Sequence, residues 1–358
     1  MTDIDTAPTV ESLAQRVLDA SLGTIDLISM YIGDRLGWYR SLATDGPATP
    51  EELAARTGTD TRYAREWLEQ QAATGLLVAS DGDPRTYTLL DTAAEVLTDE
   101  HSLNYLGPLA RMLCGFAVHL PELLDAYRTG GGVSWADLGA DARESQAAMN
   151  RPWFEKALPS ALASVPELHD RLRKPGIEIA DIGCGGAWST IALARAYPQA
   201  RVTGYDIDPA TVALATSNVA EHPDVSDRVT IIEADAQELP EGRFSAAFAF
   251  ECIHDMPRPV EVLGAMRRAL TDDGVVVVMD EAVADEFTAP ANEIDRLMYG
   301  FSLTCCLPDS MSHPGSVGTG TVMRMSTLRR YALEAGFADV SVLPIENFDL
   351  WRFYLLTT

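Results

Sequence analysis

A glycine-rich segment, Asp181-Ile-Gly183-Cys-Gly185-Gly186-Ala187, follows an apolar run and precedes a helical pattern that begins at about Ser189. Glycines at such a turn let the backbone approach a ligand closely, because a β-carbon would obstruct it. Gly183 and Gly185 are therefore candidate ligand-binding residues. Asp181 either contacts the same ligand or braces the loop.

Acidic residues end the two apolar runs that come next along the chain. Asp206, followed by Ile207, comes about 20 residues beyond the glycine loop, the spacing of an acid that accepts hydrogen bonds from ribose hydroxyls. Asp235 and Ala236 follow the third run, where a carboxylate would meet an adenine amino group. Each acid could instead be a solvated residue at a strand end, but the repetition at every strand favours a nucleotide site.

A fourth apolar run ends in a segment that carries three polar residues with acid–base chemistry, Glu251, His254 and Asp255. A fifth run ends in Asp280 and Glu281. Open α/β sheets bind ligands at the carboxyl ends of their strands, so these five side chains are expected at the same edge as the glycine loop.

The elements that must position these residues alternate between strand and helix patterns from Ile177 onward, which predicts a parallel sheet wound on both sides. The predicted strands are Ile177 to Ile182, Val202 to Asp206, Val229 to Glu233, Ala246 to Glu251 and Val275 to Asp280, with a final strand pair at Val340 to Pro344 and Trp351 to Leu356. The fold class is therefore α/β, a Rossmann-like doubly wound sheet with a terminal antiparallel strand pair. Phe287 to Met325, rich in Met, Pro, Ser and Gly, is expected to be an irregular insertion.

The N-terminal part of the chain has a different pattern. An amphipathic helix is predicted from Glu11 to Leu36, long enough to pair with a partner. A helix from Pro50 to Arg56, a second through Ala73 and two short strands within Leu76 to Leu90 predict a winged helix. The expected domains are 1–100 (winged helix and dimerisation), 101–175 (a helical linker contributing to the substrate pocket) and 176–358 (catalytic, with 287–325 covering the substrate).

A winged helix often reads DNA, but the charge of this chain opposes that role. The chain has 53 acidic and 27 basic residues and a formal net charge of -26. DNA-binding proteins draw affinity from basic side chains on phosphates, and the second helix of the motif pairs Arg62 and Arg65 with Glu66 and Glu69. We expect no nucleic-acid partner, and the module to serve dimerisation and pocket walls.

Composition also limits location and metal content. No apolar stretch approaches a membrane span, and the first nine residues carry no export signal, so we expect a cytoplasmic protein without a membrane partner. The five cysteines show neither disulfide nor zinc spacing. The vicinal Cys305 and Cys306 could capture a soft metal or arsenic, but buried apolar thiols are the commoner use, and no metal site is expected.

The loop glycines together with the acids Asp181, Asp206 and Asp235 resemble the class I methyltransferase superfamily over Ile177 to Thr358. The resemblance implies S-adenosyl-L-methionine as cofactor, with Glu251 also at its site. Ala187 departs from the pattern, because a third glycine often stands there, and its methyl group is expected to narrow the approach to the methionine moiety.

The winged module, helical linker and catalytic domain together are similar to the small-molecule O-methyltransferases of plants and actinobacteria, whose His-Asp pair matches His254-Asp255. The resemblance implies that His254 removes the proton from a substrate hydroxyl; a structural histidine is the alternative. Asp280 and Glu281 are placed where such families keep an acid that orients the base, and the sequence does not say which one acts.

The sequence thus predicts a homodimeric enzyme that methylates a hydroxyl of an aromatic or other small metabolite. Candidate substrate-pocket residues, which are equally compatible with plain core, are Trp153, Phe154, Met298, Tyr299 and Phe301. The alternatives are an N- or C-methyltransferase on the same fold, or a ligand-sensing transcriptional regulator that retains the cofactor pocket. The sequence does not name the methyl acceptor.

Overall fold

The computed structural model describes residues 8–348 and 350–358, and the chain divides into two compact units, Met1–Cys114 and Gly115–Thr358. Most of the first nine residues, for which the sequence analysis expects no export signal, lie outside the described part of the chain. Among the helices that are described, none has the length and apolarity needed to span a membrane. The division between the units falls inside helix α6 (Gly107–Val118), beyond the boundary expected near residue 100.

The first unit is a winged helix preceded by a long helix. Its elements are α1 (Val10–Arg35), α2 (Trp38–Asp45), α3 (Pro50–Thr57), α4 (Thr61–Ala73), β1 (Leu77–Ala79), β2 (Tyr87–Leu89) and α5 (Asp91–Thr98). Thr49 and Glu52 form a reciprocal capping box at the start of α3, and the Asp60 carboxylate caps α4. Strands β1 and β2 pair antiparallel as the wing. The predicted helix-turn-helix and wing are confirmed.

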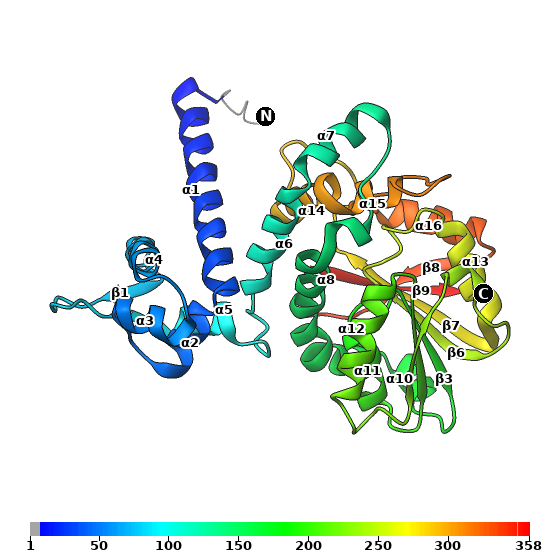
Figure 1. Ribbon diagram of the computed structural model, residues 1–358. Coiled ribbons are helices and arrows are strands. Elements are labelled where there is room, and N and C mark those ends of the chain that lie inside the picture. Colours follow the sequence, from blue (N-terminus) through cyan, green and yellow to red (C-terminus); the bar gives the residue numbers. More distant parts are fainter. Residues whose placement is uncertain (1–7, 349) are drawn as a thin grey trace. The chain divides into compact units, whose positions relative to one another are not determined.

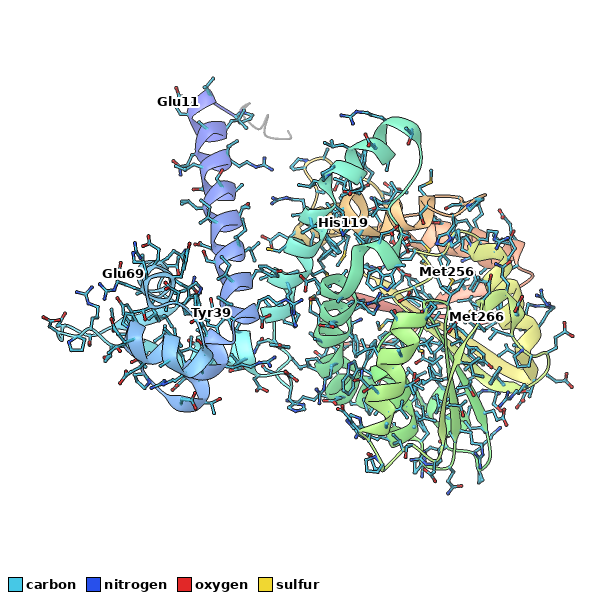
Figure 2. The ribbon with its side chains drawn as sticks, viewed as in Figure 1. Glu11, Tyr39, Glu69, His119, Met256 and Met266 are labelled. Carbon is cyan, nitrogen blue, oxygen red and sulfur yellow. The ribbon has the colours of Figure 1, made fainter. Side chains whose placement is uncertain are left out.

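A small aromatic core holds this unit together. Trp38 and Tyr39 pack against Trp67 with ring centroids 4.9 Å away in each case. Figure 2 shows Tyr39 within the unit, whereas Glu11 and Glu69 lie on the outer faces of their helices. Helix α1 joins this core only near its C-terminal end, where Gly33 is so close to Trp67 that a β-carbon would lie 2.3 Å from the indole ring.

The second unit is built on one seven-stranded sheet with the order β5-β4-β3-β6-β7-β9-β8. The strands are β3 (Glu178–Ile182), β4 (Arg201–Asp206), β5 (Val229–Glu233), β6 (Phe244–Phe250), β7 (Leu270–Glu281), β8 (Asp339–Val342) and β9 (Trp351–Thr357). The first five run parallel, and β9 pairs antiparallel with both β7 and β8. The predicted doubly wound sheet with a terminal antiparallel pair is therefore confirmed.

Helices cover both faces of this sheet (Figure 1). They are α8 (Trp135–Pro152), η1 (Trp153–Ala157), α9 (Leu158–Ala163), α10 (Pro166–Leu172), α11 (Trp188–Ala196), α12 (Pro209–Ala220), η2 (Ala236–Glu238), α13 (Pro259–Ala269) and α16 (Met325–Glu334), whereas α7 (Leu120–Thr129) lies away from the sheet. One apolar layer lies between the sheet and α9 to α12, and the other includes Met266 of α13 and Leu328 of α16. Because both faces are covered, β6 is apolar along almost its whole length rather than alternating.

The expectation that residues 287–325 form an irregular insertion is wrong for the middle of the segment. Residues 293–311 form three consecutive helical pieces, α14 (Glu293–Phe301), η3 (Ser302–Cys306) and α15 (Leu307–Met311). The Asn292 side chain caps the first, and η3 is a π-helical turn that ends two residues before Pro308. Proline has no N–H for the usual i to i−4 hydrogen bond, so its presence obscured the helical pattern.

Candidate active site

The glycine loop connects β3 to α11 at the carboxyl edge of the sheet. Gly183 and Gly185 both have positive φ, +64° and +53°, in the left-handed region that favours glycine. A β-carbon on Gly183 would lie 2.8 Å from Cys252 Cβ, whereas one on Gly185 would meet nothing within 4 Å. Gly183 is therefore needed for packing against the segment after β6, and Gly185 is the position with open space for a ligand.

Ala187 also has a left-handed backbone, with φ of 63°, which explains why glycine would suit this position. Its conformation costs an alanine roughly 1–2 kcal/mol. The residue is completely buried and belongs to the apolar cluster on one face of the sheet. Its methyl group thus has a packing role, an alternative to the expected narrowing of the ligand's approach.

Asp181 is buried at the end of β3 and connects this strand to the start of α11, on the far side of the glycine loop. One carboxylate oxygen accepts hydrogen bonds from Ser189 Oγ at 2.7 Å and from Thr190 Oγ1 at 2.5 Å, both in the first turn of α11. The other oxygen has no hydrogen-bond partner among the described residues. Burial raises the pKa of Asp181 to about 6. These contacts favour the bracing interpretation that the sequence left open.

Asp206 joins the end of β4 to the glycine loop. Its carboxylate accepts hydrogen bonds from the backbone N–H groups of Gly185 and Asp208, each at 3.0 Å. Burial raises its pKa above the ordinary aspartate value, although the two backbone donors oppose that shift. The next residue, Ile207, is 62% exposed and leaves an apolar surface beside the carboxylate.

Asp235 and Ala236 lie after β5, as expected. Asp235 accepts a hydrogen bond from the backbone N–H of Gln237 at 2.9 Å and so caps the short helix η2. Its second oxygen lies 4.0 Å from Arg258 Nη2. The side chain is 36% exposed, so it remains accessible to a ligand at this edge.

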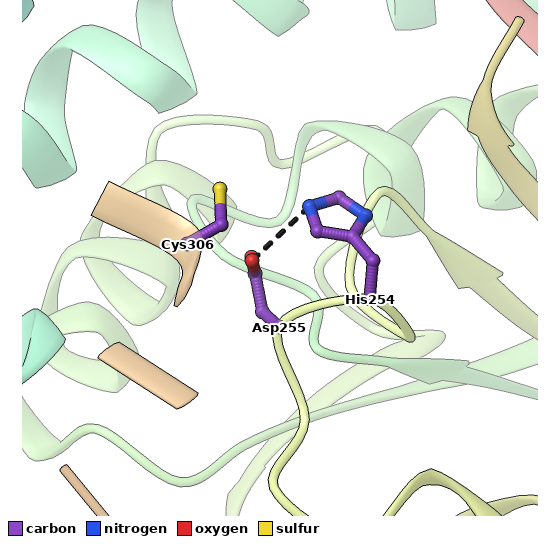
Figure 3. Close-up of side chains that lie close together, drawn as sticks. All are labelled: His254, Asp255 and Cys306. Carbon is purple, nitrogen blue, oxygen red and sulfur yellow. Dashed lines mark ion pairs between the residues drawn. The ribbon is translucent and has the colours of Figure 1, made fainter. Parts of the chain in front are cut away.

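His254 lies beyond β6, almost completely buried, between acids from two strand ends. Its Nδ1 is 2.9 Å from Asp280 Oδ1 in a hydrogen bond and 3.1 Å from Glu281 Oε2. Its Nε2 is 3.1 Å from Asp255 Oδ1 (Figure 3). Of the two β7 acids, Asp280 is the one aligned for the hydrogen bond, since Glu281 Oε2 has no such partner among the described residues.

This arrangement strongly favours a proton on the ring. Burial by itself lowers the pKa of His254, but the charges of Asp255, Asp280 and Glu281 outweigh it and raise the pKa well above its usual 6.5. Burial raises the pKa of Glu281 to about 8, and the neighbouring histidine opposes that shift. The three carboxyl groups around the ring therefore favour the protonated imidazole.

Glu251 occupies an unusual position between β6 and His254. Its φ of 52° is rare for a residue with a side chain, and such strain is common at functional sites. Its Oε2 accepts hydrogen bonds from Gln146 Nε2 at 3.1 Å and Asn150 Nδ2 at 2.5 Å. Burial, followed by the nearby Glu281, raises its pKa to about 8. Sequence reasoning missed the two amides, although their spacing of four places them on one face of α8.

Helices η3 and α15 extend over the loop that carries His254. Cys306 of η3 lies beside Asp255, and the two side chains and the ring of His254 come close together (Figure 3). Asp309 of α15 accepts a hydrogen bond from the backbone N–H of Trp135 at 2.7 Å, which ties α15 to the start of α8. Burial and the nearby Asp255 raise the pKa of Asp309 to about 7.

The five aromatic and apolar candidates for a substrate pocket fall into two groups. Trp153 packs against Phe348 and Trp351, and Phe154 against Phe250, all in the apolar layer under the sheet. The other three lie on α14: Met298 is buried, Tyr299 is partly exposed beside Phe287, and Phe301 contacts Phe116 edge to face. Core packing thus accounts for the first pair, and the α14 group remains the better candidate for a pocket wall.

Two families of known proteins match this chain. Residues 179–274 match the methyltransferase domain, and residues 24–99 match the Rv2258c-like winged helix-turn-helix domain. The first match includes the glycine loop, the acids after β4 and β5, and His254. The second coincides with the winged helix of the first unit. The chain therefore carries a winged-helix domain followed by a methyltransferase domain.

Curated relatives match over part of the chain. A 2-methyl-6-phytyl-1,4-hydroquinone methyltransferase from Synechocystis sp. is 31% identical over 140 residues, which is 39% of this chain and 42% of the relative. A ubiquinone biosynthesis O-methyltransferase from Xanthomonas campestris pv. campestris is 33% identical over 107 residues, 30% of this chain and 44% of the relative. The chain thus spans less than half the length of these two relatives.

Solved structures match over nearly the whole chain. The mitomycin 7-O-methyltransferase MmcR superposes with a TM-score of 0.74 at 18% identity and covers 97% of this chain and 98% of its own. PigF with SAH gives a TM-score of 0.74 at 18% identity, and the match covers 98% of this chain and 100% of PigF. At this identity the likeness shows the fold alone, and it extends over both units of the chain.

Proposed function

We propose that this chain, with its winged-helix domain and class I methyltransferase domain, transfers the methyl group of S-adenosylmethionine to a hydroxyl group of a small molecule, aromatic or otherwise. The observation that supports it best is His254, held through Nδ1 by Asp280 at 2.9 Å at the same sheet edge as the glycine loop. A curated relative and a solved structure that are named as O-methyltransferases support the same reaction class.

The glycine loop and the acids at the ends of the next two strands fit the methyl donor. Gly185 has open space where a side chain would be, the Asp206 carboxylate is available to ribose hydroxyls, and Asp235 is available to an adenine amino group. Ile207, 62% exposed, offers an apolar surface for a flat ring. When bound, S-adenosylmethionine supplies an electrophilic methyl group attached to a positively charged sulfur.

His254 is the proposed general base. Asp280 accepts the Nδ1 hydrogen bond, which leaves Nε2 as the nitrogen that receives the proton of the substrate hydroxyl. In the ligand-free protein Asp255 lies 3.1 Å from Nε2, so the hydroxyl would replace that carboxylate at the ring. The imidazole must first lose its own proton, and the surrounding carboxylates then stabilise the imidazolium formed during transfer.

An amine acceptor is the second candidate. The N,N-8-amino-8-demethyl-D-riboflavin dimethyltransferase from Streptomyces davawensis has a similar fold, with a TM-score of 0.63 at 20% identity. The match covers 98% of this chain and 100% of the dimethyltransferase. Such an acceptor would depend less on His254. The regulator alternative is disfavoured, since the arginines of α4 pair with acids, Arg62 with Glu66 and Arg65 with Glu51.

A homodimer is also part of the proposal. Side chains along α1 form an apolar stripe that the described residues leave exposed: Leu13, Val17, Leu18, Leu22, Ile25, Ile28 and Ile32. A stripe of this length favours association, because water-exposed apolar surface is stabilised when it is buried. A second copy of the chain offers the same stripe.

The test is the kinetics of His254→Ala on a panel of phenols, catechols and matched anilines. We expect turnover of the hydroxyl acceptor to fall by ~10²-fold or more, while calorimetry shows nearly unchanged S-adenosylmethionine affinity. His101→Ala, an exposed histidine of the first unit, is the control and should behave like the parent. Turnover that survives in the His254 variant would favour an amine or carbon acceptor.

A further inference from the structure

Three side chains with different metal-binding atoms meet beside the proposed base. His254 and Asp255 follow β6, and Cys306 comes from η3, so the group is assembled from two distant segments (Figure 3). Their ligand atoms, an imidazole nitrogen, a carboxylate oxygen and a thiol sulfur, lie within 4.8 Å of one another. These are the three ligand types that zinc uses in proteins.

The histidine is already oriented as a ligand. Histidines that bind zinc almost always donate the other ring N–H to a carboxylate or carbonyl, which fixes the tautomer and makes the free nitrogen more basic. Here Nδ1 is hydrogen-bonded to Asp280 at 2.9 Å, so Nε2 is the nitrogen left for a metal. Asp280 would therefore support the metal site without itself binding the metal.

The carboxylate of Asp255 is the second independent observation. Its Oδ1 is buried and has no hydrogen-bond partner among the described residues, although it lies only 3.1 Å from Nε2. A ring nitrogen and a carboxylate oxygen that lie close together, but are not aligned for a hydrogen bond with each other, can both bind the same metal ion. The N to O separation across tetrahedral zinc is about 3.3 Å, so this pair needs little movement.

We propose that His254 Nε2, Asp255 and Cys306 bind a divalent zinc-like cation, with the fourth position left to water or a ligand. The thiol proton and the Nε2 proton of the imidazole pass to solvent as the sulfur and the nitrogen bind. The N to S separation in such a site is about 3.6 Å. The Cys306 sulfur lies within 4.8 Å of the other two ligand atoms, so it has to move toward the imidazole nitrogen by at most about 1.2 Å. The sequence predicted no metal site because His254 and Cys306 are too far apart along the chain for a spacing motif.

The consequence for activity rests on the proposed function. A cation on Nε2 occupies the lone pair that would take the substrate's proton, so the metal would be an inhibitor and not a cofactor. Zinc should then lower turnover reversibly, and a chelator should restore it.

The binding test uses the untagged full-length protein and Co²⁺ as a spectroscopic probe for zinc. We expect one ion per chain, with visible bands of tetrahedral cobalt and an ultraviolet thiolate-to-cobalt charge-transfer band. Cys306→Ala should abolish the charge-transfer band and weaken binding by at least the roughly 10–100-fold that loss of a supporting partner costs. Cys305→Ala is the matched control, since this neighbouring thiol is outside the group, and it should keep both signals.

Three results would overturn the proposal: no bound cobalt, binding without a sulfur band, or equal loss in Cys305→Ala, which would indicate a dithiol site. Asp255→Asn provides a second check that preserves side-chain volume and should also weaken binding. The inhibition test compares each variant with its own metal-free rate. Cobalt binding without inhibition would leave the metal site intact and contradict only His254 as the base.

Discussion

His254 is subject to opposing influences, and its pH dependence follows from their balance. The carboxylates of Asp255, Asp280 and Glu281 raise its pKa well above 6.5 in spite of burial. Only the neutral ring accepts a proton, so the rate should be low at acidic pH and should rise through a value above 6.5. The measurement is kcat/KM for a hydroxyl acceptor from about pH 6 to pH 10.

Two variants separate this explanation from ionisation of the acceptor itself. Asp280→Asn removes one of the charges that raise the pKa and should move the inflection toward lower pH. His254→Ala should lose the inflection and regain rate only where the acceptor ionises, for a phenol at about pH 10. An unchanged inflection in both variants would show that another group controls the rate.

Asp206 allows a direct test of the cofactor site. Asp206→Ala should weaken S-adenosylmethionine binding by roughly 1–3 kcal/mol, the size of a lost charge-assisted hydrogen-bond pair. Because Asp206 also accepts from Gly185 and Asp208, the variant needs a thermal unfolding control to show that the loop is folded. Calorimetry that finds unchanged affinity in a folded variant would remove Asp206 from the site.

At the scale of the element, the two glycines of the glycine loop have different surroundings: Gly183 packs against a neighbouring segment, whereas Gly185 faces open space. The sequence argument predicts that a side chain at position 183 occupies cofactor space, whereas the structure shows that it would first collide with Cys252. Gly183→Ala should lower the free energy of unfolding by roughly 2–5 kcal/mol, the sum of left-handed strain and overpacking.

Gly185→Ala is the matched comparison in the same loop. It has the same sign of φ but no neighbour within 4 Å, so it should cost only the strain, roughly 1–2 kcal/mol. Its larger effect should be on cofactor affinity. Denaturant unfolding and calorimetry on both variants measure the two quantities, and equal destabilisation would contradict the packing difference.

At the scale of the whole molecule, the apolar stripe of α1 predicts that the full-length chain is a dimer. Replacing Leu18 and Leu22, both more than half exposed, by aspartate should give a monomer, because two charges would be buried at the interface. Gln15→Glu adds a charge on the same helix and should leave the dimer intact. Light scattering measures the outcome, and a monomeric parent protein would refute the premise.

Substitutions in α1 test the dimer better than deletion of residues Met1 to Leu36 does. We also expect the deletion to give a poorly soluble monomer. The Ser29 carbonyl accepts a hydrogen bond from Trp67 Nε1 at 2.9 Å, and Gly33 packs against the same indole. A cut after Leu36 would therefore remove part of the core of the first unit as well as the stripe. Loss of the dimer could then reflect misfolding.

Much of the architecture was predictable because its signals are local. Apolar periodicity, capping residues and turn residues involve neighbours a few positions apart, so α1, α3, α4 and most strands of the sheet lie close to their predicted bounds, although β7 begins five residues before the predicted start at Val275. The acids at the strand ends were found for the same reason. The helices at 293–311 were missed, because Pro308 and the small polar residues around it concealed a local signal.

By itself the sequence determined the winged helix, the doubly wound sheet and the edge at which the acids and His254 gather, since all of these depend on residues close together in the chain. Only the tertiary structure decided which partners meet there. Asp280 rather than Glu281 holds the ring, two amides of α8 bind Glu251, and Cys306 comes beside His254 from another segment. Contacts between distant segments depend on how whole elements pack against one another, and no spacing along the chain records that packing.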